Sequence, residues 1–405
     1  MIARADGQVI LVAGAIPGER ARISIERVAK GVAYGAVDEV EERSPDRREP
    51  HSDPLCGGAL YAYISYPRQL TLKAEIVADA LARIGRVTWT PAIEVAASPE
   101  DGYRMRARLH LRDGRAGFFR EGSHQTCSAR QTGQLLPATS DVVEEIASRL
   151  ATSATGSSAE IEVSENVDAS ERAVHLETTP PLARSALTEL GGIAGLTGLT
   201  ASQPAAGDQA VSVVSGDPFV HDILAFQNTE VVLRRHVIAF FQGNRFLIRP
   251  LVEHVLAHIP DGADLVDLYA GVGLFAVAAA AVRGAQVTAV EGDRVAAADL
   301  AANAKRAGDL MTAVHQSVER FVGGHRAPPG VVLIDPPRTG LSKEALDGVI
   351  RLQPRRLIYV SCDVATLARD LRRLVESGYE LRDLSAFDLF PTTPHVETVA
   401  VLARG

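Results

Sequence analysis

Cysteine, membrane-spanning runs and a leader pattern are scarce or missing. Three cysteines occur in 405 residues, far apart and odd in number, which is typical of a reducing compartment and predicts no disulfide framework. The best membrane candidate, Leu268 to Val282, has fifteen uncharged residues, fewer than the roughly 20 that span a bilayer. The first ten residues lack the apolar core of a signal peptide. We therefore expect a soluble cytoplasmic protein without a membrane partner.

Positive charge is also lacking over the chain as a whole. The 42 lysines and arginines stand against 50 acidic residues, a formal net charge of −8, so a nucleic-acid partner would need a locally basic surface. The hydrophobic share of 46% and the charged share of 23% exclude a disordered, collagen-like or coiled-coil chain. The length of 405 residues predicts two or three domains.

One basic surface is predicted from residues 103–112. If these residues form a strand, alternation places Arg104, Arg106 and Arg108 on one face and apolar residues on the other. Between residues 102 and 131, seven arginines stand against two acidic residues, a local charge of +5. Three arginines in register suit RNA phosphates, and a solvated strand face is the alternative.

Changes in composition and in hydrophobic pattern divide the chain into three predicted domains. Residues 1–48 contain short strands separated by turns and end at a charged, proline-marked linker. Residues 49–215 contain an amphipathic helix over 70–84, the basic strand, an acidic helix, and an uncharged stretch at 191–208 that predicts a loop. Residues 216–405 form the third domain.

The first domain resembles a TRAM domain, a small OB-like β-barrel found on RNA-modifying enzymes. The resemblance rests on Asp-Gly-Gln-Val at residues 6–9 and Gly-Ala-Ile-Pro-Gly-Glu at residues 14–19. A generic small β-barrel is the alternative interpretation.

The third domain alternates short apolar runs with helical patterns, which predicts an α/β fold with a parallel, doubly wound sheet. No helical pattern joins the last two strands, so we expect them to pair antiparallel. Seven strands that end in this way resemble the class I methyltransferase sheet. The predicted strands are residues 264–268, 286–290, 312–315, 331–334, 356–360, 380–387 and 398–402.

A glycine-bearing turn predicts a nucleoside-cofactor site. Asp-Leu-Tyr-Ala-Gly-Val-Gly at residues 267–273 follows a strand and opens a helix, so Gly271 and Gly273 allow a tight turn against a ligand. Glu291, at the end of the next strand, is placed to accept both ribose hydroxyls. An acid begins the run and Ala276 replaces a dinucleotide-fold glycine, which favours S-adenosylmethionine over NAD. A turn that binds no ligand is the alternative.

Two further strand ends carry reactive groups. Asp-Pro-Pro-Arg at residues 335–338 closes a strand at the edge where open α/β sheets bind ligands, and such a segment is used by methyltransferases of planar bases. Cys362 stands on a turn before a helix, whose N-terminus is expected to lower the thiol pKa and favour a nucleophile. Prolines that only end a strand and a cysteine that only fills space are the alternatives.

Together these motifs resemble the RNA uracil-5-methyltransferase family. With the TRAM-like start, the resemblance covers nearly the whole chain. The matching runs are Asp-Leu-Tyr-x-Gly-x-Gly from residue 267, Asp-Pro-Pro-Arg from 335, Ser-Cys-x-x-Ala-Thr-Leu-Ala-Arg-Asp from 361, and Phe-Pro-x-Thr-x-His-Val-Glu from 390.

The resemblance implies a role for each matched residue. Carbon 5 of uracil is a weak nucleophile, so Cys362 would add to carbon 6 as a thiolate and make carbon 5 enolate-like. Glu397 matches the base that then removes the carbon 5 proton, with His395 as the alternative base. Asp335 matches the acid placed against the uracil and the methyl donor. The residues that match cofactor-binding positions are Gln242, Tyr269 and Glu291.

The sequence also departs from the family. Many relatives hold an iron–sulfur cluster on four cysteines, one pair in Cys-Gly-Gly-Cys, but here Cys56 begins Cys-Gly-Gly-Ala and Cys127 does not complete a set of four. We therefore expect no iron–sulfur cluster and no other metal. Leu274 and Ser317 replace the asparagine and the acid or amide that the family often has, so these two cofactor contacts are not carried over.

The first hypothesis is a monomeric RNA 5-methyluridine synthase whose target uridine is single-stranded or flipped out. Its RNA is 23S rRNA in preference to tRNA, because the TRAM-like module is typical of the ribosomal branch. The alternatives are an exocyclic-amine methyltransferase and a non-catalytic RNA-binding protein with a relict methyltransferase fold. The joint presence of Cys362, Asp335 and Glu397 argues against both alternatives.

Overall fold

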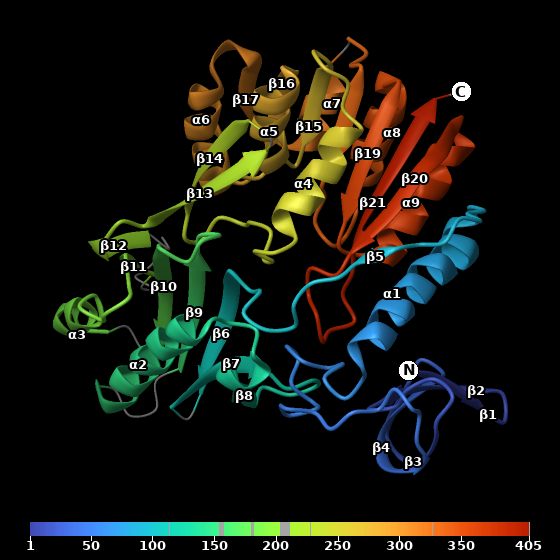
Figure 1. Ribbon diagram of the computed structural model, residues 1–405, viewed down its shortest axis with the longest axis vertical. Coiled ribbons are helices and arrows are strands. Elements are labelled where there is room, and N and C mark those ends of the chain that lie inside the picture. The colour runs from blue at the N-terminus through green and yellow to red at the C-terminus, as the bar shows by residue number, and fades with distance from the viewer. Residues whose placement is uncertain are drawn as a thin grey trace.

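Three sheets and a separate hairpin carry most of the chain (Figure 1). The computed structural model describes residues 1–112, 114–153, 158–179, 182–202, 211–226, 228–325 and 327–404. An eight-stranded sheet with its helices occupies the upper part of Figure 1, and the seven-stranded and four-stranded sheets lie below it. Among the described residues, no helix has the length and apolar character needed to cross a membrane.

The N-terminal segment forms the four-stranded sheet, in the order β1-β2-β4-β3, with only the β2–β4 pair parallel. Its core is small and consists of Ile10, Val12 and Ala33, so contacts with the linker add to its stability. Arg47 of the linker forms an ion pair with Glu19 at 2.6 Å. A sheet is therefore present where short strands were predicted, and its closure into a barrel stays a prediction. The strands are β1 Ile2–Ala5, β2 Gln8–Ala13, β3 Arg20–Ala29 and β4 Val32–Glu42.

The seven-stranded sheet has the order β12-β11-β10-β9-β6-β7-β8 and contains the basic strand. In β6, Ala107, Leu109 and Leu111 are buried as the alternation predicts, while Arg104 precedes the strand. The helices of this region are α2 Pro137–Ser153 and α3 Arg184–Leu190, with a 3-10 turn at Arg130–Thr132. The strands are β6 Arg106–Arg112, β7 Arg115–Phe119, β8 Thr126–Ser128, β9 Ser158–Glu165, β10 Arg172–Thr179, β11 Gly198–Ser202 and β12 Val211–Gly216.

The expected loop at residues 191–208 was wrong in part, because Gly198–Ser202 form strand β11. All five residues of β11 are buried between β10 and β12. A strand buried on both faces has no polar alternation, so periodicity could not reveal it. Residues 203–208 of that stretch lie outside the described residues.

Cys56 and Cys127 form a disulfide bond, so the expectation drawn from the scattered cysteines was wrong for this pair. Their Cα atoms lie 5.7 Å apart although 71 residues separate them in the sequence. The hairpin of β7 and β8 pairs Phe118 with Cys127, and Cys56 bridges to Arg120 beyond the end of β7. Strand pairing therefore brings the two cysteines together, which sequence spacing does not show. Cys362 is a free thiol.

The eight-stranded sheet has the order β17-β16-β15-β18-β19-β21-β20-β5 and confirms all seven predicted strands. Its strands are parallel except for β21, which pairs antiparallel with both β19 and β20. The two-residue strand β5 adds an edge that the sequence did not predict. The strands are β5 Val95–Ala96, β15 Asp264–Leu268, β16 Gln286–Glu291, β17 Met311–His315, β18 Val331–Ile334, β19 Arg356–Ser361, β20 Tyr379–Phe387 and β21 Glu397–Arg404.

Helices cover both faces of this sheet. Apolar residues of α4, α5 and α6 pack on one face, and those of α1, α7, α8 and α9 pack on the other. The helix expected over residues 70–84 is α1, which continues as a π-helical turn at Leu81–Gly85 and runs from beside the N-terminal sheet to the large sheet in Figure 1. The helices are α1 Tyr66–Ala80, α4 Ile248–Ala257, α5 Leu274–Arg283, α6 Arg294–Ala307, α7 Val318–Gly324, α8 Lys343–Leu352 and α9 Val364–Glu376, with a 3-10 turn at Gly308–Leu310. The separate hairpin is β13 Phe219–Phe226 and β14 Thr229–His236.

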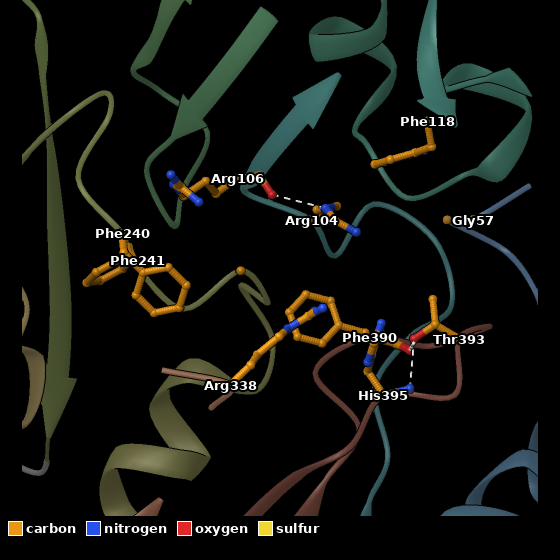
Figure 2. A pocket seen from close by; sticks show the side chains of 12 residues that line it. Gly57, Arg104, Arg106, Phe118, Phe240, Phe241, Arg338, Phe390, Thr393 and His395 are labelled. Carbon is orange, nitrogen blue, oxygen red and sulfur yellow. Dashed lines mark hydrogen bonds between the residues drawn. The ribbon is translucent and has the colours of Figure 1, made fainter. Parts of the chain in front are cut away.

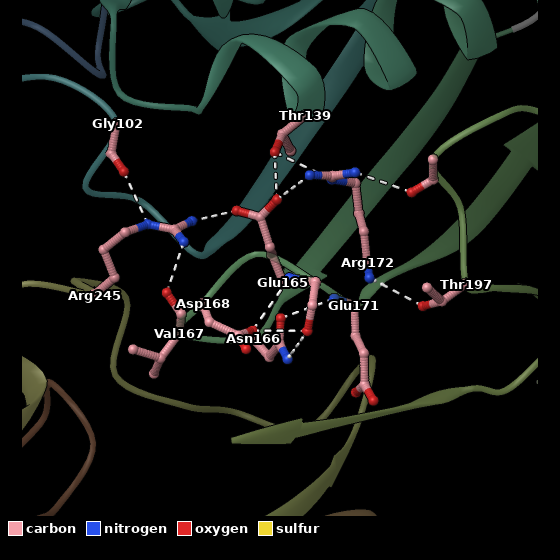
Figure 3. A network of polar contacts seen from close by, with 12 residues as sticks. Gly102, Thr139, Glu165, Asn166, Val167, Asp168, Glu171, Arg172, Thr197 and Arg245 are labelled. Carbon is pink, nitrogen blue, oxygen red and sulfur yellow. Dashed lines mark hydrogen bonds and ion pairs between the residues drawn. The ribbon is translucent and has the colours of Figure 1, made fainter. Parts of the chain in front are cut away.

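A buried polar network joins the seven-stranded sheet to the segment that leads into α4 (Figure 3). Glu165, at the end of β9, forms ion pairs with both Arg172 and Arg245. Thr139 donates a hydrogen bond to the same carboxylate at 2.6 Å, and Arg245 Nε donates to the Gly102 carbonyl at 2.9 Å. Buried charges that are fully paired and hydrogen-bonded hold one geometry, so this network fixes the two parts against each other.

Candidate active site

The carboxyl ends of the parallel strands bring the predicted site residues to one edge of the large sheet. Asp267 and Glu291 lie at the ends of β15 and β16, and Asp335 and Cys362 directly follow β18 and β19. Glu397 begins the antiparallel strand β21 beside them and is 2% exposed. Ligands of open α/β sheets bind at this edge, so the topology places the candidate residues where chemistry is expected.

The glycine-bearing turn after β15 is held by Glu291. The Gly271 amide donates a hydrogen bond to Glu291 Oε2 at 2.8 Å. Gly273 has φ of +97°, and a Cβ there would lie 2.8 Å from Leu300 Cδ1, so the turn requires glycine at this position. A Cβ on Gly271 would meet no atom within 4 Å, so the turn has open space beside it. The backbone of this turn therefore has room for a ligand at the start of α5.

Two further predicted cofactor residues border the same edge. Tyr269 has φ of +62°, a backbone conformation unusual for a non-glycine residue. Gln242 Nε2 donates a hydrogen bond to Asp335 Oδ2 at 3.2 Å, which links the segment before α4 to the end of β18. These contacts place Gln242 beside the acid that the sequence assigns to both substrate and cofactor.

The carboxylates at this edge repel one another, and their pKa values are raised. Burial and the neighbouring Asp335 and Glu291 raise the pKa of Asp267 well above its usual range. Burial raises the pKa of Asp335 to about 7, against the hydrogen bond from Gln242. Burial, together with Asp335, also raises the pKa of Glu397 well above its usual range. This edge therefore disfavours further negative charge and favours a cation.

The acidic edge fits S-adenosylmethionine, which carries a sulfonium and an ammonium group. Both carboxylate oxygens of Asp267 are buried, and no well-oriented hydrogen bond from a described residue reaches them, although the Ala276 amide lies close enough to lower the pKa. Buried polar groups without a partner are rare in folded proteins, and a bound ligand is one reason for them. The donor set and the charge of the site thus match a positively charged nucleoside cofactor.

Cys362 does not have the lowered pKa that its place before a helix predicted. Burial, with the charges of Glu397 and Asp335, raises the pKa of the thiol to about 11, although Arg338 beside it acts in the opposite direction. The prediction was wrong because it considered only the helix N-terminus, and the neighbouring carboxylates come from strands distant in the sequence. The thiol therefore needs a proton acceptor before it can react as a thiolate.

A cavity of about 260 Å³ lies next to this edge, and Arg338, which contacts Cys362, is part of its lining (Figure 2). Phe240 and Arg106 line one side of it, and Phe390 and His395 line the other. Phe240 is 60% exposed, a large apolar ring that the protein itself leaves uncovered. Flat rings and guanidinium groups around a hollow suit the stacking of an unpaired base.

Arg338 and His395 add a polar part to this cavity. Burial and the neighbouring Arg338 lower the pKa of His395 to about 4, so the imidazole is neutral at physiological pH. Arg338 also contacts the thiol of Cys362, which connects the cavity with the nucleophile. No role was predicted for Arg338 beyond its place in the Asp-Pro-Pro-Arg run, although its position close to Asp335 was the available signal.

The predicted basic face is partly neutralised in the structure. Arg106 forms an ion pair with Glu162 and Arg108 forms one with Glu160, both on the adjacent strand β9. Arg104 instead donates to Gln134 Oε1 at 2.9 Å and lies 5.4 Å from the centre of the Phe390 ring. A count of charges along residues 102–131 could not include acids that β-pairing places opposite the arginines.

The loop between β20 and β21, which precedes Glu397, is anchored by α1. Lys73 forms a buried ion pair with Asp388 and donates to the Phe390 carbonyl at 3.1 Å. The Thr392 amide donates to Gln69 Oε1 at 2.9 Å. The sequence reasoning missed this anchor, although two polar residues four positions apart on the apolar face of a helix were a signal for it.

Comparisons with known proteins agree with this geometry. The order of the strands and the turn after β15 define the fold of S-adenosylmethionine-dependent methyltransferases. The Pyrococcus abyssi tRNA (uracil-54, C5)-methyltransferase, solved with S-adenosyl-L-homocysteine, shares this fold with a TM-score of 0.74 at 24% identity, over 97% of this chain and 95% of that chain.

Sequence comparison identifies the family within the methyltransferase fold. A model of the tRNA (uracil-5-)-methyltransferase family matches residues 328–405. The 23S rRNA (uracil(1939)-C(5))-methyltransferase RlmD of Methylococcus capsulatus is 30% identical over 436 residues, covering 100% of this chain and 94% of that protein. An RNA methyltransferase of Thermotoga maritima, described as uncharacterized, is 28% identical over 99% of this chain and 95% of its own length. The chain belongs to the RNA uracil-5-methyltransferase family.

Proposed function

We propose that this enzyme methylates carbon 5 of a specific uridine in RNA through a covalent adduct with Cys362. The observation that carries the proposal is the meeting of Cys362, Glu397 and Asp335 at one sheet edge, in front of a cavity lined by arginine and phenylalanine. A thiol, two carboxylates and a base-sized hollow are the groups that addition and elimination at a pyrimidine ring require.

The side chains have distinct tasks in this chemistry. The Cys362 thiol, with a pKa of about 11, gives its proton to the neighbouring Asp335 carboxylate, which leaves Glu397 free to act as a base later, and its sulfur bonds to carbon 6 of the uracil. The electron pair of the carbon 5–carbon 6 double bond moves toward carbon 4, which makes carbon 5 a nucleophile. After methylation, Glu397 removes the carbon 5 proton, the double bond re-forms and the thiolate leaves.

Bound S-adenosylmethionine supplies the electrophilic methyl group. Glu291 accepts a hydrogen bond from the Gly271 amide of the turn, and Gln242 donates one to Asp335 at the neighbouring strand end. The residues that would hold the cofactor are Gln242, Tyr269, Gly271, Gly273, Glu291 and Asp335. Its positive charge offsets the crowded carboxylates, so the same acids that raise one another's pKa favour its binding.

The cavity suits binding of an unpaired RNA base. A stacked or paired base cannot reach Cys362, so the uridine has to be single-stranded or flipped out. Phe240 and Phe390 offer faces for stacking, and Arg104 lies over the rings of Phe118 and Phe390 at 5.0 and 5.4 Å. Arg106 and Arg108 would contact phosphates by exchanging their glutamate partners for RNA.

For the target we prefer 23S rRNA over tRNA. This preference is supported by the 30% identity with an enzyme named for 23S rRNA and by a sheet at the position of the TRAM-like module. We further propose that residues 1–48, 49–215 and 216–405 are three domains of a cytoplasmic monomer that holds no iron–sulfur cluster.

The decisive assay for this function uses unmodified 23S rRNA and unmodified tRNA in parallel, with labelled S-adenosylmethionine. Nucleoside analysis should find labelled 5-methyluridine in the rRNA, and none with the Cys362→Ala variant. Label in a base that is methylated on an exocyclic amine would favour the alternative, an exocyclic-amine methyltransferase. Absence of methylation on every RNA would favour a relict fold.

A further inference from the structure

Three side chains that can bind a metal meet on the face of the large sheet covered by α4. His254 and His258 come from α4 and its C-terminal cap, and Asp383 comes from β20. Asp383 Oδ2 lies 3.2 Å from His254 Nε2 and 3.4 Å from His258 Nε2. All three ligand atoms lie within 4.8 Å of one another. Asp383 pairs with Val401, which pairs with Ile358 in the middle of β19, whereas the substrate edge lies beyond Ser361 at the carboxyl end of that strand.

Local structure explains why these side chains converge. Residues four apart on a helix share one face, so His254 and His258 project side by side, with ring centres 5.0 Å apart. Strand β20 has a bulge between Leu381 and Asp383, where Arg382 has no partner on β21. Four residues of β20 pack on the face of the sheet that α9 covers: Tyr379 and Leu381 before the bulge, and Leu384 and Ala386 after it. The bulge thus turns Asp383 toward α4.

The spacing of the ligand atoms fits a small divalent ion. Tetrahedral coordination with bonds of about 2.0–2.1 Å separates neighbouring ligand atoms by about 3.4 Å. The two histidine–carboxylate separations, 3.2 and 3.4 Å, already have this value. His254 Nε2 is buried and makes no hydrogen bond with any described residue, which leaves its lone pair or proton without a well-oriented partner.

We propose that His254, His258 and Asp383 bind one divalent transition-metal ion, with zinc as the expected metal and water as its fourth ligand. Two imidazoles and one carboxylate are a common protein donor set for zinc, and the i, i+4 histidine pair is a frequent way to present them. His254, His258 and Asp383 meet only through the fold, because about 125 residues separate the histidines from Asp383 in the sequence.

The surroundings of the cluster are compatible with an ion. The ring of Phe387 lies 5.6 Å from that of His254, and Ser385 donates to Asp383 at 3.4 Å. The Arg356 guanidinium donates to the His258 carbonyl at 2.6 Å.

The ion would connect two elements that lead to the active site. Gln242 precedes α4 by six residues, and Asp388 directly follows β20. A metal bound between α4 and β20 would therefore hold the cofactor-side segment and the start of the loop before Glu397 in one relative position. Its role would be to stabilise the fold, without contact with the substrate.

Metal binding to the full-length protein tests the proposal. The protein is treated with a chelator, dialysed and titrated with Co²⁺, whose visible absorption reports coordination, and then with Zn²⁺. We expect one ion per chain, displacement of Co²⁺ by Zn²⁺, and a higher melting temperature with metal. His254→Gln and Asp383→Asn should each weaken binding by at least about 10-fold, since even partners outside the ligand set change affinity that much.

Two controls separate this site from other metal-binding groups. His221→Gln is the matched control, because His221 lies 3.2 Å from Glu171 with similar exposure but has no second imidazole, and it should bind as the wild type does. Cys362→Ala removes the free thiol and should also leave binding unchanged. His258→Gln serves as an independent variant if one of the others fails to fold by circular dichroism. Binding only at millimolar metal, equal binding by the cluster variants, or loss in Cys362→Ala would overturn the proposal.

Discussion

Cys362 should be a slow nucleophile in the protein without RNA. Its pKa of about 11 leaves about 0.1% of the thiol ionised at pH 8, whereas an ordinary cysteine with a pKa of about 8.5 is about one quarter ionised. Since the thiolate is the reactive form, alkylation of Cys362 by iodoacetamide at pH 8 should be about 200-fold slower than that of an unhindered cysteine.

The assay is alkylation followed by intact mass, from pH 6.5 to 10, without reductant so that Cys56 and Cys127 remain paired. The denatured protein supplies the reference rate. Glu397→Gln removes a charge that raises the thiol pKa and should speed alkylation, whereas Arg338→Gln removes the opposing charge and should slow it further. A native pH profile with a midpoint below 8.5 would refute the reasoning, because it would mean that the helix N-terminus dominates.

Three further predictions concern the surroundings of the site. Lys73→Met leaves the buried Asp388 without its ion-pair partner and should lower the free energy of unfolding by about 3–5 kcal/mol in urea titrations. The control Lys305→Met, at an exposed residue, should change it little. Equal effects of the two variants would contradict the role of Lys73 in anchoring the loop. Asp335, whose pKa is raised to about 7, favours folding most at low pH and loses that contribution as the pH rises from about 4 to 7. Asp335→Asn should therefore add up to about 4 kcal/mol at pH 8 and less at pH 5 by thermal unfolding; the reverse order would contradict the sign. Anaerobically purified protein should contain no stoichiometric iron or acid-labile sulfide, because three cysteines do not complete a four-cysteine set, and finding both would show that a cluster is present.

Seven of the eight strands of the large sheet were predictable from the sequence, because they are short apolar runs and helical patterns separate most of them. The predicted strands at residues 264–268 and 331–334 have the observed bounds, and the others differ by one or two residues at one or both ends. The site residues were also predictable as a group, since Asp335 and Cys362 follow parallel strands that end at the same edge. Local pattern and topology were sufficient for both.

Contacts between distant segments were not predictable. The raised pKa of Cys362 depends first on burial of the thiol and then on Glu397 and Asp335, and all three arise only through the sheet order. The pairing of Arg108 with Glu160 depends on the register of β6 with β9, and the disulfide depends on the β7–β8 hairpin. Each of these is a consequence of tertiary structure that spacing along the chain does not contain.

Trapping the covalent intermediate tests the proposed chemistry most directly. Wild type, Glu397→Gln, Cys362→Ala and His395→Ala are incubated with unmodified RNA and S-adenosylmethionine, and protein–RNA adducts are measured on denaturing gels and by mass. Glu397→Gln should accumulate an adduct that carries the methyl group, because the carbon 5 proton is not removed and Cys362 cannot leave. His395→Ala, the control for the alternative base, should accumulate none beyond the wild type. Cys362→Ala should form neither adduct nor 5-methyluridine, and methylation by this variant at the wild-type rate would contradict the assignment of the nucleophile.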